Sequence, residues 1–436
     1  MQNIDVTSIL DKAPINKQHF ILVFWCSVIM LFDGYDMVIY GSLLPHLMND
    51  WQLSAQQAGF LGSASLIGMM IGAVTLTIAA DKFGRKRIVL FCTTLFSLAV
   101  LSNCFADNPT NFFICRLFTG IGLGGAIPTM VTIIKEMAPS DYRNRLINFM
   151  LAMYGVGAIL SGLAGLFLIP VLGWQAVFIL GGLSILLLPL LYKTFPESVR
   201  YLVQKNLQHE VIQALKKLNS NHQHQEGMLY INEGIGSEQK TSLLNLFNHG
   251  RAFQTILIWL CFAMIMLMVY GVNTWLPKLM NIAGYSLGAS ITFLVVLNIG
   301  NIFGTMLFGA LADKWGVKST LILGLLICAC AIAALGLHPP MLLLHTLLLI
   351  AGGVMFGSLS VAHALAADFY PTSIRSTGIG FAAAMGRFGA IGGPLLGGLI
   401  LSMQLPFELN FIVFAIPGVI GALVIGLFNI KMKAIE

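Results

Sequence analysis

The sequence predicts an all-α membrane protein with twelve transmembrane helices in two parallel six-helix repeats. Three observations predict this fold: the composition, a succession of long apolar runs, and an internal repeat. Of the 436 residues, 57% are hydrophobic and only 10% are charged, whereas soluble chains carry roughly a quarter charged residues. Long continuous apolar runs are typical of helices and differ from the alternating pattern of a membrane barrel.

Each apolar run is long enough to cross a bilayer, which takes about 20 helical residues. The first run follows a polar N-terminal segment and is too long for the core of a signal peptide, so we expect no cleaved leader. The predicted spans are 19–46, 56–79, 88–106, 112–136, 145–170, 174–193, 251–281, 287–311, 319–337, 340–366, 375–402 and 408–429.

The basic residues predict the orientation of these spans. With a cytoplasmic N-terminus, 21 of the 24 Lys and Arg fall at the termini or in connections on the same side, and Lys278 is alone on the other side. The positive-inside rule then predicts a multi-pass protein of the inner (plasma) membrane with both termini cytoplasmic. The net charge of +6 therefore does not require a nucleic-acid partner. All seven cysteines fall in spans, which argues against a disulfide or a structural zinc site.

An internal repeat appears when the sequence is shifted by 232 residues against itself. The repeat predicts an N-terminal half at 1–193, a cytoplasmic linker at 194–250 and a C-terminal half at 251–436. Parallel halves of this kind form their substrate site at the interface between them, near the middle of the bilayer. Four pairs of segments coincide without a gap: Leu44 to Asn49 with Leu276 to Asn281, Asp81 to Lys86 with Asp313 to Lys318, Glu136 to Arg143 with Asp368 to Arg375, and Met153 to Ile159 with Met385 to Ile391.

The linker carries most of the remaining charge, with one helix predicted around 207–219. Its histidines, His222 and His224, are possible metal ligands, but no Cys or carboxylate stands beside them at ligand spacing. We favour a solvated polar loop and expect no metal site.

Several motifs resemble a known family. The loop A-D-K-F-G-R-K-R, repeated as A-D-K-W-G-V-K, resembles the signature loop of the major facilitator superfamily. D-G-Y-D, R-L-F-T-G-I-G-L-G-G-A-I-P and P-E-S-V-R-Y-L are similar to motifs of its aromatic acid:proton symporters, the benzoate, 4-hydroxybenzoate and muconate transporters. One departure is Thr77, where the family loop usually has glycine; Gly309 keeps that glycine in the second half.

The signature loops point to a conformational latch at the cytoplasmic helix ends. A charged residue there can form a charge-assisted bond to a neighbouring helix in one conformation. The alternative is a solvated loop that only sets orientation, although this leaves the recurring Asp-x-x-Gly unexplained. The expected latch or topology residues are Asp81, Gly84, Arg85, Glu136, Arg143, Asp313, Gly316, Asp368 and Arg375.

Four strongly ionisable residues lie well inside spans: Asp33, Asp36, Arg116 and Arg387. Charges facing lipid are costly, so such groups face a bundle interior or a watery cavity. Asp33 and Asp36 are three residues apart and share one helix face. Two carboxylates in a low dielectric repel each other when both are ionised, which favours proton exchange during transport. The alternative is a static ion pair of one Asp with Arg116, and both hold if one Asp pairs and the other titrates.

Arg387 is the leading candidate for binding the anionic group of a substrate, with Arg116 second, because guanidinium presents a planar fork that suits a carboxylate. Aromatic and polar side chains in the spans complete the candidate site. For any single one of them, helix packing or a bond to neighbouring backbone is the alternative. They are Tyr35, Tyr40, Tyr154, Tyr270, Trp275 and Phe388, with Asn298, Asn301, His345 and His363.

Together these features predict a proton-coupled importer of a small organic anion, most simply an aromatic carboxylate, working by alternating access. Alternatives are a non-benzenoid acid such as muconate or nicotinate, a sugar, or a membrane sensor that does not transport. The sequence has no G-x-S-x-G, Walker or H-E-x-x-H motif, and the glycines at 120–125 lie in a span with no strand before them. We therefore expect no enzyme activity, no cofactor beyond the coupling proton, and a functional monomer in the lipid bilayer.

Overall fold

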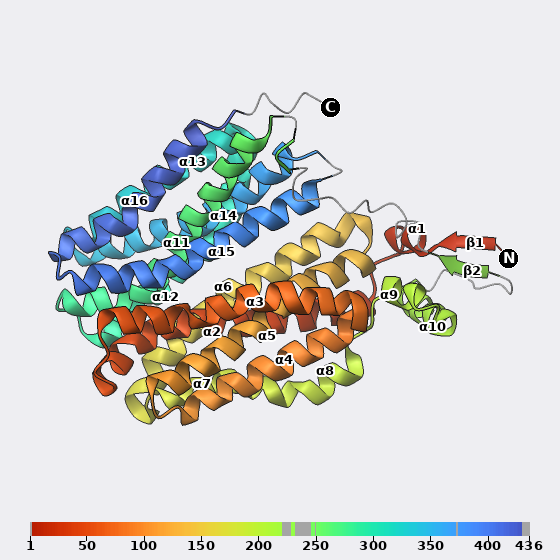
Figure 1. Cartoon of the computed structure of the whole chain (residues 1–436), viewed down its shortest axis with the longest axis horizontal. Helices are drawn as coiled ribbons and strands as arrows, with labels where there is room; N and C mark the ends of the chain where they lie inside the picture. The colour runs from red at the N-terminus through yellow and green to blue at the C-terminus, as the bar shows by residue number, and fades with distance from the viewer. Residues whose placement is uncertain (1, 220–227, 232–245, 249, 372–373, 430–436) are drawn as a thin grey trace.

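The computed structural model describes residues 2–219, 228–231, 246–248, 250–371 and 374–429. Within them, twelve helices are long and apolar enough to cross a membrane. The prediction of an all-α membrane protein with twelve spans is confirmed, and each helix coincides with a predicted apolar run to within a few residues (Figure 1).

The first six spans form one bundle. Three of these spans begin at a side-chain cap: Asn16, Ser54 and Asn108 each accept hydrogen bonds from backbone N–H groups of the first turn, a position that such residues favour. The sixth span is a composite of two α-helices around a 3₁₀ turn. The helices are α2 (Lys17–Asp50), α3 (Ala55–Phe83), α4 (Arg85–Ser102) with η1 (Asn103–Phe105), α5 (Pro109–Met137), α6 (Ser140–Leu172), and α7 (Gln175–Gly182), η2 (Leu183–Leu187) and α8 (Leu188–Thr194).

The last six spans form a second bundle of the same order. They are α11 (Ala252–Ile282), α12 (Leu287–Trp315), α13 (Val317–Leu335), α14 (Met341–Phe369), α15 (Arg375–Ser402) and α16 (Phe407–Gly426). In both bundles a single glycine joins the second helix to the third. Gly84 has φ 101° and Gly316 has φ 83°, a backbone conformation that side-chain-bearing residues rarely adopt. The glycine of the Asp-x-x-Gly motif is therefore required by the turn itself.

Contacts between helices within each bundle repeat with the 232-residue shift. A Cβ on Gly157 would lie 1.9 Å from the carbonyl oxygen of Leu31, and one on Gly389 would lie equally close to that of Ala263. Small residues allow such close approach of helices in a membrane. Three further glycine contacts recur at the same shift: Gly68 on Leu117 with Gly300 on Leu349, Gly72 on Ile121 with Gly304 on Gly353, and Gly120 on Ser65 with Gly352 on Leu297.

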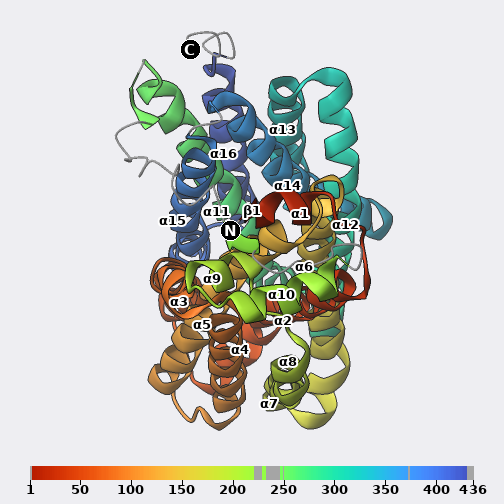
Figure 2. The ribbon, with the colours of Figure 1, turned by 90° about the vertical axis from the view of Figure 1, so that its right-hand side faces the viewer.

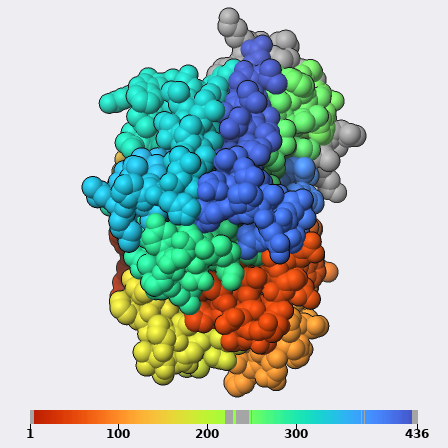
Figure 3. All heavy atoms as spheres, turned by 90° about the vertical axis from the view of Figure 1, so that its left-hand side faces the viewer, coloured from red at the N-terminus to blue at the C-terminus, as the bar shows by residue number. Residues whose placement is uncertain are grey.

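The two bundles, here called the N-half and the C-half, lie side by side and touch mainly at one end. We name the end that carries the N-terminus and α10 the linker end, and the opposite end the far end (Figures 1 and 2). At the far end, Gln56 donates a hydrogen bond to Ser402 at 3.2 Å, and Gly59 packs on the Pro394 carbonyl. Figure 3 views this end and shows atoms of both halves in contact. Toward the linker end the helices of the two halves diverge (Figure 1).

Short elements cover the linker end of the N-half. They are α1 (Val6–Asp11), α9 (Val199–Gln204), α10 (Gln208–Leu218) and a parallel pair of strands, β1 (Gln2–Asp5) with β2 (Met228–Ile231). Helix α10 lies where the sequence predicts a linker helix. The strands are not predicted, because each has four residues and its partner is far away in the sequence. His222 and His224 lie outside the described residues.

Candidate functional site

A buried ion pair lies within the N-half. Arg116 Nη1 of α5 is 2.7 Å from Asp36 Oδ1 of α2, and both side chains are almost fully buried. The same nitrogen donates to the backbone carbonyl of Asp36 at 3.2 Å. The ring of Tyr40, one turn further along α2, lies 5.8 Å from the guanidinium carbon, a distance at which a cation and an aromatic face attract each other. Asp36, Tyr40 and Arg116 therefore form one unit inside a single half.

Asp33 stands one turn earlier on α2 and has a different environment. Its side chain is 2% exposed, and Oδ1 has no hydrogen-bond partner among the described residues. Arg387 of the C-half and Asp36 both act on it electrostatically. The close approach of Gly34 to the backbone of Tyr154 places α2 directly against α6 at this level. The two aspartates are thus neighbours in the chain with different partners. Asp36 faces α5, and Asp33 interacts across the contact between the halves.

Arg387 lies near the middle of α15 and forms no ion pair with any described residue. Its Nη1 lies 3.2 Å from the thioether sulfur of Met69 on α3 of the N-half, and thioether sulfur is only a weak acceptor. Its charge also reaches Tyr154 and Tyr270. The guanidinium group of Arg387, at the level where the two halves meet, therefore has N–H donors that bind no carboxylate of the described chain.

Two tyrosines bridge the halves beside Arg387. The side chains of Tyr154 of α6 and Tyr270 of α11 interact with each other electrostatically, and the Tyr154 ring packs 6.1 Å from Phe356 of α14. Both tyrosines interact electrostatically with Asp33. The result is a cluster of one carboxyl, one guanidinium and two phenols drawn from α2, α6, α11 and α15.

The asparagines of α12 add amide groups near this level. Asn298 Nδ2 donates to Asn273 Oδ1 of α11 at 3.0 Å, while its own Oδ1 is buried without a partner among the described residues. The carbonyl of Asn273 packs on Gly41 of α2. Asn301 lies next to Gly155 of α6. Asn298 and Asn301 therefore both lie close to the contact between the halves, and Asn273 belongs with them.

Other residues considered from the sequence lie elsewhere. Tyr35 donates to the Val177 carbonyl at 2.8 Å within the N-half, and Trp275 Nε1 donates to the Pro394 carbonyl at 2.9 Å within the C-half. His345 lies in the first turns of α14 near the far end and bonds to the Met341 carbonyl at 2.7 Å. Phe388, on α15, is 58% exposed. The structure does not bring these four side chains to the Asp33 and Arg387 cluster.

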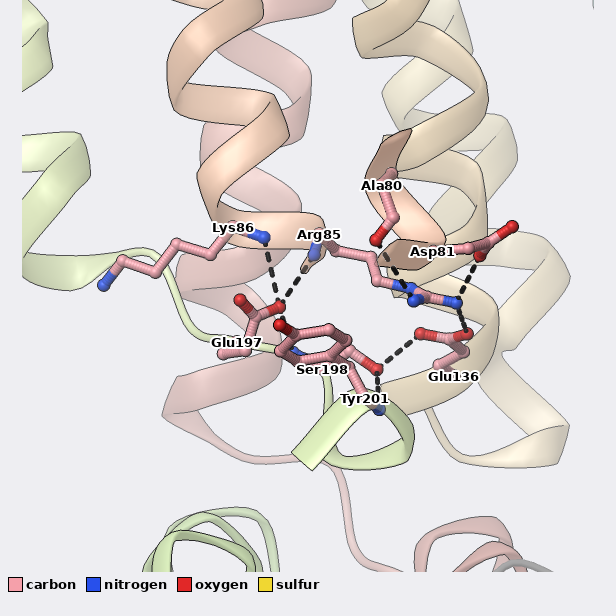
Figure 4. Close-up of polar contacts among 8 residues, drawn as sticks. All are labelled: Ala80, Asp81, Arg85, Lys86, Glu136, Glu197, Ser198 and Tyr201. Atoms are coloured by element: carbon pink, nitrogen blue, oxygen red, sulfur yellow. Dashed lines mark hydrogen bonds and ion pairs between the residues drawn. The ribbon is translucent and has the colours of Figure 1, made fainter. Parts of the chain in front are cut away.

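A second network lies at the linker end of the N-half (Figure 4). Arg85 Nη2 is 2.9 Å from Asp81 Oδ1 and 3.0 Å from Glu136 Oε1, so it ties α3, α4 and α5 together. Glu136 also accepts a hydrogen bond from Ser198, after α8. Arg143 does not join it and instead lies 2.6 Å from Asp11 at the end of α1.

Glu197 caps the N-terminus of α4. Its Oε1 accepts hydrogen bonds from the backbone N–H groups of Arg85 at 2.9 Å and Lys86 at 3.1 Å. Gly84, at the N-cap position, has no side chain that could accept them. A carboxylate at this position also interacts favourably with the helix dipole. Burial nevertheless raises the pKa of Glu197, and the backbone hydrogen bonds oppose that shift. Glu197 and Ser198 belong to the P-E-S motif, which is their only signal in the sequence.

Among its described residues, the C-half shows no arginine-centred network of this kind. Val317 occupies the position that Arg85 holds in the repeat, and the exposed Asp313 forms no ion pair with a described residue. Lys318 instead donates to the carbonyls of Gly426 and Phe428, at 2.9 Å and 2.6 Å, at the end of α16. Arg375 Nε donates to the Tyr370 carbonyl at 3.3 Å. The signature loop thus keeps its turn in both halves and its arginine-centred network in one.

Twelve apolar helices in two six-helix repeats, with ionisable groups at the contact between the repeats, define a class: a multi-pass membrane protein built like a secondary transporter. The chain belongs to the Major Facilitator Superfamily, whose family model matches residues 26–360 and 297–433.

Relatives of the chain include transporters named for benzoate and gallate. It is 36% identical to the benzoate transport protein of Acinetobacter baylyi over 434 residues, which are 98% of this chain and 93% of the relative. It is 34% identical to a gallate transporter of Pseudomonas putida, over 97% of this chain and 94% of the relative. The crystal structure of a D-xylose-proton symporter superposes with a TM-score of 0.76 at 21% identity, covering 95% and 99% of the two chains, and shares the fold.

Proposed function

We propose that this protein imports an aromatic carboxylate of the benzoate or hydroxybenzoate type together with protons, by alternating access. The observation that carries the proposal is Arg387. This guanidinium stands at the contact between the halves, has no carboxylate partner in the described chain, and has Met69 as its nearest polar contact. A substrate carboxylate is the group that a free guanidinium fork binds best.

Asp33 is the coupling carboxyl in this proposal. It is buried, its Oδ1 lacks a hydrogen-bond partner, and it senses the charge of Arg387. An uncompensated ionised carboxylate in a membrane interior is costly. Asp33 avoids this cost either by holding a proton or by coming closer to Arg387. Entry of an anionic substrate at Arg387 would shift Asp33 between its protonated state and its ionised state close to Arg387. Substrate binding is thereby linked to the binding and release of a proton.

Tyr154, Tyr270 and Phe356 would supply aromatic surface beside the carboxylate site. They come from both halves, so a ring held among them would contact both halves at once. Rocking of the halves about the site would then expose it first to one side of the membrane and then to the other. The halves are in contact at the far end and their helices diverge toward the linker end, from which we infer a state that faces the linker end.

We infer that the linker end is cytoplasmic in a bacterial inner membrane, from the distribution of Lys and Arg. In a variant whose seven native cysteines are replaced, single cysteines at the exposed positions Asp107 and Lys205 test this. An impermeant thiol reagent added to intact cells should label the first and spare the second. The reverse pattern would contradict the orientation.

Transport itself is tested with purified protein in liposomes. Labelled benzoate should accumulate under an imposed pH gradient and fail to accumulate when an ionophore removes the gradient. Arg387→Ala should weaken benzoate binding by about 10–100-fold, the worth of a charged hydrogen bond, and Arg387→Lys should weaken it less. Arg145→Ala, at an exposed arginine of α6, is the matched control. Wild-type affinity in Arg387→Ala would remove Arg387 from the site.

A further inference from the structure

A cavity of about 370 Å³ lies at the linker end of the N-half, away from the contact between the halves. Its walls come from the starts of α2 and α4, the end of α8 with the segment after it, and α10. Three lysines line it, Lys86, Lys193 and Lys217, together with two carboxylates, Glu197 and Glu210. None of the properties derived above uses this cavity.

The positive charges of the cavity are less compensated than the negative ones. Glu197 Oε1 already accepts the backbone N–H groups at the start of α4, and Glu210 lies in the first turn of α10, where the helix dipole favours a negative charge. The ammonium groups of the three lysines form no ion pair with a described residue. An anion placed among them would meet unpaired cations.

Lys86 shows how these charges are arranged. Its side chain extends away from the Arg85 and Glu136 network (Figure 4), and its Nζ lies 5.4 Å from the centre of the Tyr192 ring. It interacts electrostatically with Glu197 and, more weakly, with Lys217 of α10. Two like charges close together repel each other, and a bound anion relieves that repulsion.

The surroundings of the cavity are apolar on the membrane side. The sixth span, which ends at Thr194, exposes Leu186, Leu190 and Tyr192, each by more than half. Exposed apolar side chains on a transmembrane helix face lipid chains. The basic cavity therefore lies beside an exposed apolar strip of the same span, at the end of that span.

We propose that this cavity binds the phosphate group of an anionic membrane phospholipid, with the acyl chains lying along α8. Basic pockets at the cytoplasmic ends of transmembrane helices bind such headgroups. Phosphate is the shared chemistry of a lipid headgroup and of a soluble phosphate ester, and the exposed apolar strip on α8 favours the lipid.

The test compares two triple variants of the full-length protein. One replaces the cavity lysines, as Lys86→Gln, Lys193→Gln and Lys217→Gln. The control replaces three lysines of the same end that do not line the cavity, as Lys82→Gln, Lys205→Gln and Lys216→Gln. Binding of phosphatidylglycerol, phosphatidylcholine and glycerol phosphate to each purified protein is measured by native mass spectrometry.

Phosphatidylglycerol should bind the wild type and the control triple equally, and the cavity triple more weakly by about fivefold per lysine. Phosphatidylcholine should not distinguish the three proteins. Equal loss in both triples would overturn the site, since it would reflect general surface charge. Binding of glycerol phosphate as tight as that of the lipid would overturn the lipid assignment. If the cavity triple does not fold, the single variants at the exposed Lys193 and Lys217 carry the same comparison.

Discussion

Arg116 and Asp36 form an ion pair of 2.7 Å between α5 and α2 in which both side chains are almost fully buried. Asp33, three residues away on the same helix, has no such partner. Two aspartates that are equivalent by spacing therefore differ in what their loss should do, and the first two predictions separate them.

Breaking the Asp36 and Arg116 pair on one side should destabilise the fold. Arg116→Met or Asp36→Leu each leaves a buried unpaired charge, which costs about 3–5 kcal/mol. The double variant removes both charges and should unfold at a temperature closer to wild type than either single variant. Melting of the purified protein in detergent measures this. Arg143→Met, which breaks the partly exposed pair with Asp11, is the control and should cost only about 0–1 kcal/mol. Additive losses in the double variant would show that the pair is not coupled.

Asp33→Asn should leave folding intact and uncouple transport. The amide keeps the size of the carboxyl group and cannot exchange a proton. Accumulation of benzoate under an imposed pH gradient should fall to the level seen without a gradient, while exchange of internal for external benzoate continues. Asp107→Asn, at an exposed carboxyl near the far end, should behave as wild type. Normal gradient-driven accumulation in Asp33→Asn would place the coupling group elsewhere.

Glu197→Gln should change how stability depends on pH. Burial raises the pKa of Glu197 in the folded state, so the folded protein holds this proton more tightly than the unfolded chain does. The stability that the protonated group contributes is complete below the ordinary glutamate value of 4.5 and is lost as the pH rises through the folded-state value. The melting temperature of the wild type should therefore fall relative to that of Glu197→Gln across this window and run parallel above it.

The control for that pH series is Glu408→Gln, an exposed carboxyl in the first turn of α16. Its curve should follow the wild type throughout. If Glu197→Gln also follows the wild type over the whole range, the carboxyl group does not titrate differently in the folded protein.

Gly157→Ala should be poorly tolerated, because its new Cβ would lie 1.9 Å from the backbone oxygen of Leu31. Backbone atoms cannot move aside as a flexible side chain can, so α2 and α6 must separate, and overpacking of this kind costs about 1–3 kcal/mol. Gly309→Ala is the matched control, since nothing lies within 4 Å of its added Cβ. Yield and melting temperature after purification compare the two, and equal stability would mean that α2 and α6 can separate without cost.

The helices and their repeat could be predicted because both signals are local in the sequence. An apolar run marks a span by itself, and a fixed shift aligns Asp81 with Asp313 without any structural knowledge. An ion pair of one aspartate with Arg116 was one of the two alternatives from the sequence, and Asp36 forms it. Which aspartate pairs could not be predicted, because it depends on how α2 is rotated against α5 and α15. Spacing places both carboxyls on one face and says nothing of which neighbour that face meets.

Non-local and weakly patterned features also escaped prediction. Strand β1 pairs with β2, which lies beyond the whole N-half in the sequence, and a strand of four residues carries no readable alternation. Met69 and Asn273 lie at the contact between the halves, yet Met69 resembles any other apolar residue of a span. Glu197 was visible only as part of the P-E-S motif, and its role as the cap of α4 depends on a fold that returns the chain to Gly84.

The recurrence of the glycine contacts has a consequence for the chemistry of the two halves. At the 232-residue shift the glycine contacts recur. The ionisable residues do not: Asp33 aligns with Ile265, Asp36 with Met268, and Arg387 with Gly155. The duplicated scaffold is symmetric and its ionisable groups are not. A hybrid made of two N-halves would keep both sets of helix contacts and gain a second aspartate pair, yet it would contain no counterpart of Arg387. Neither half alone holds both the carboxyl group of Asp33 and the guanidinium group of Arg387.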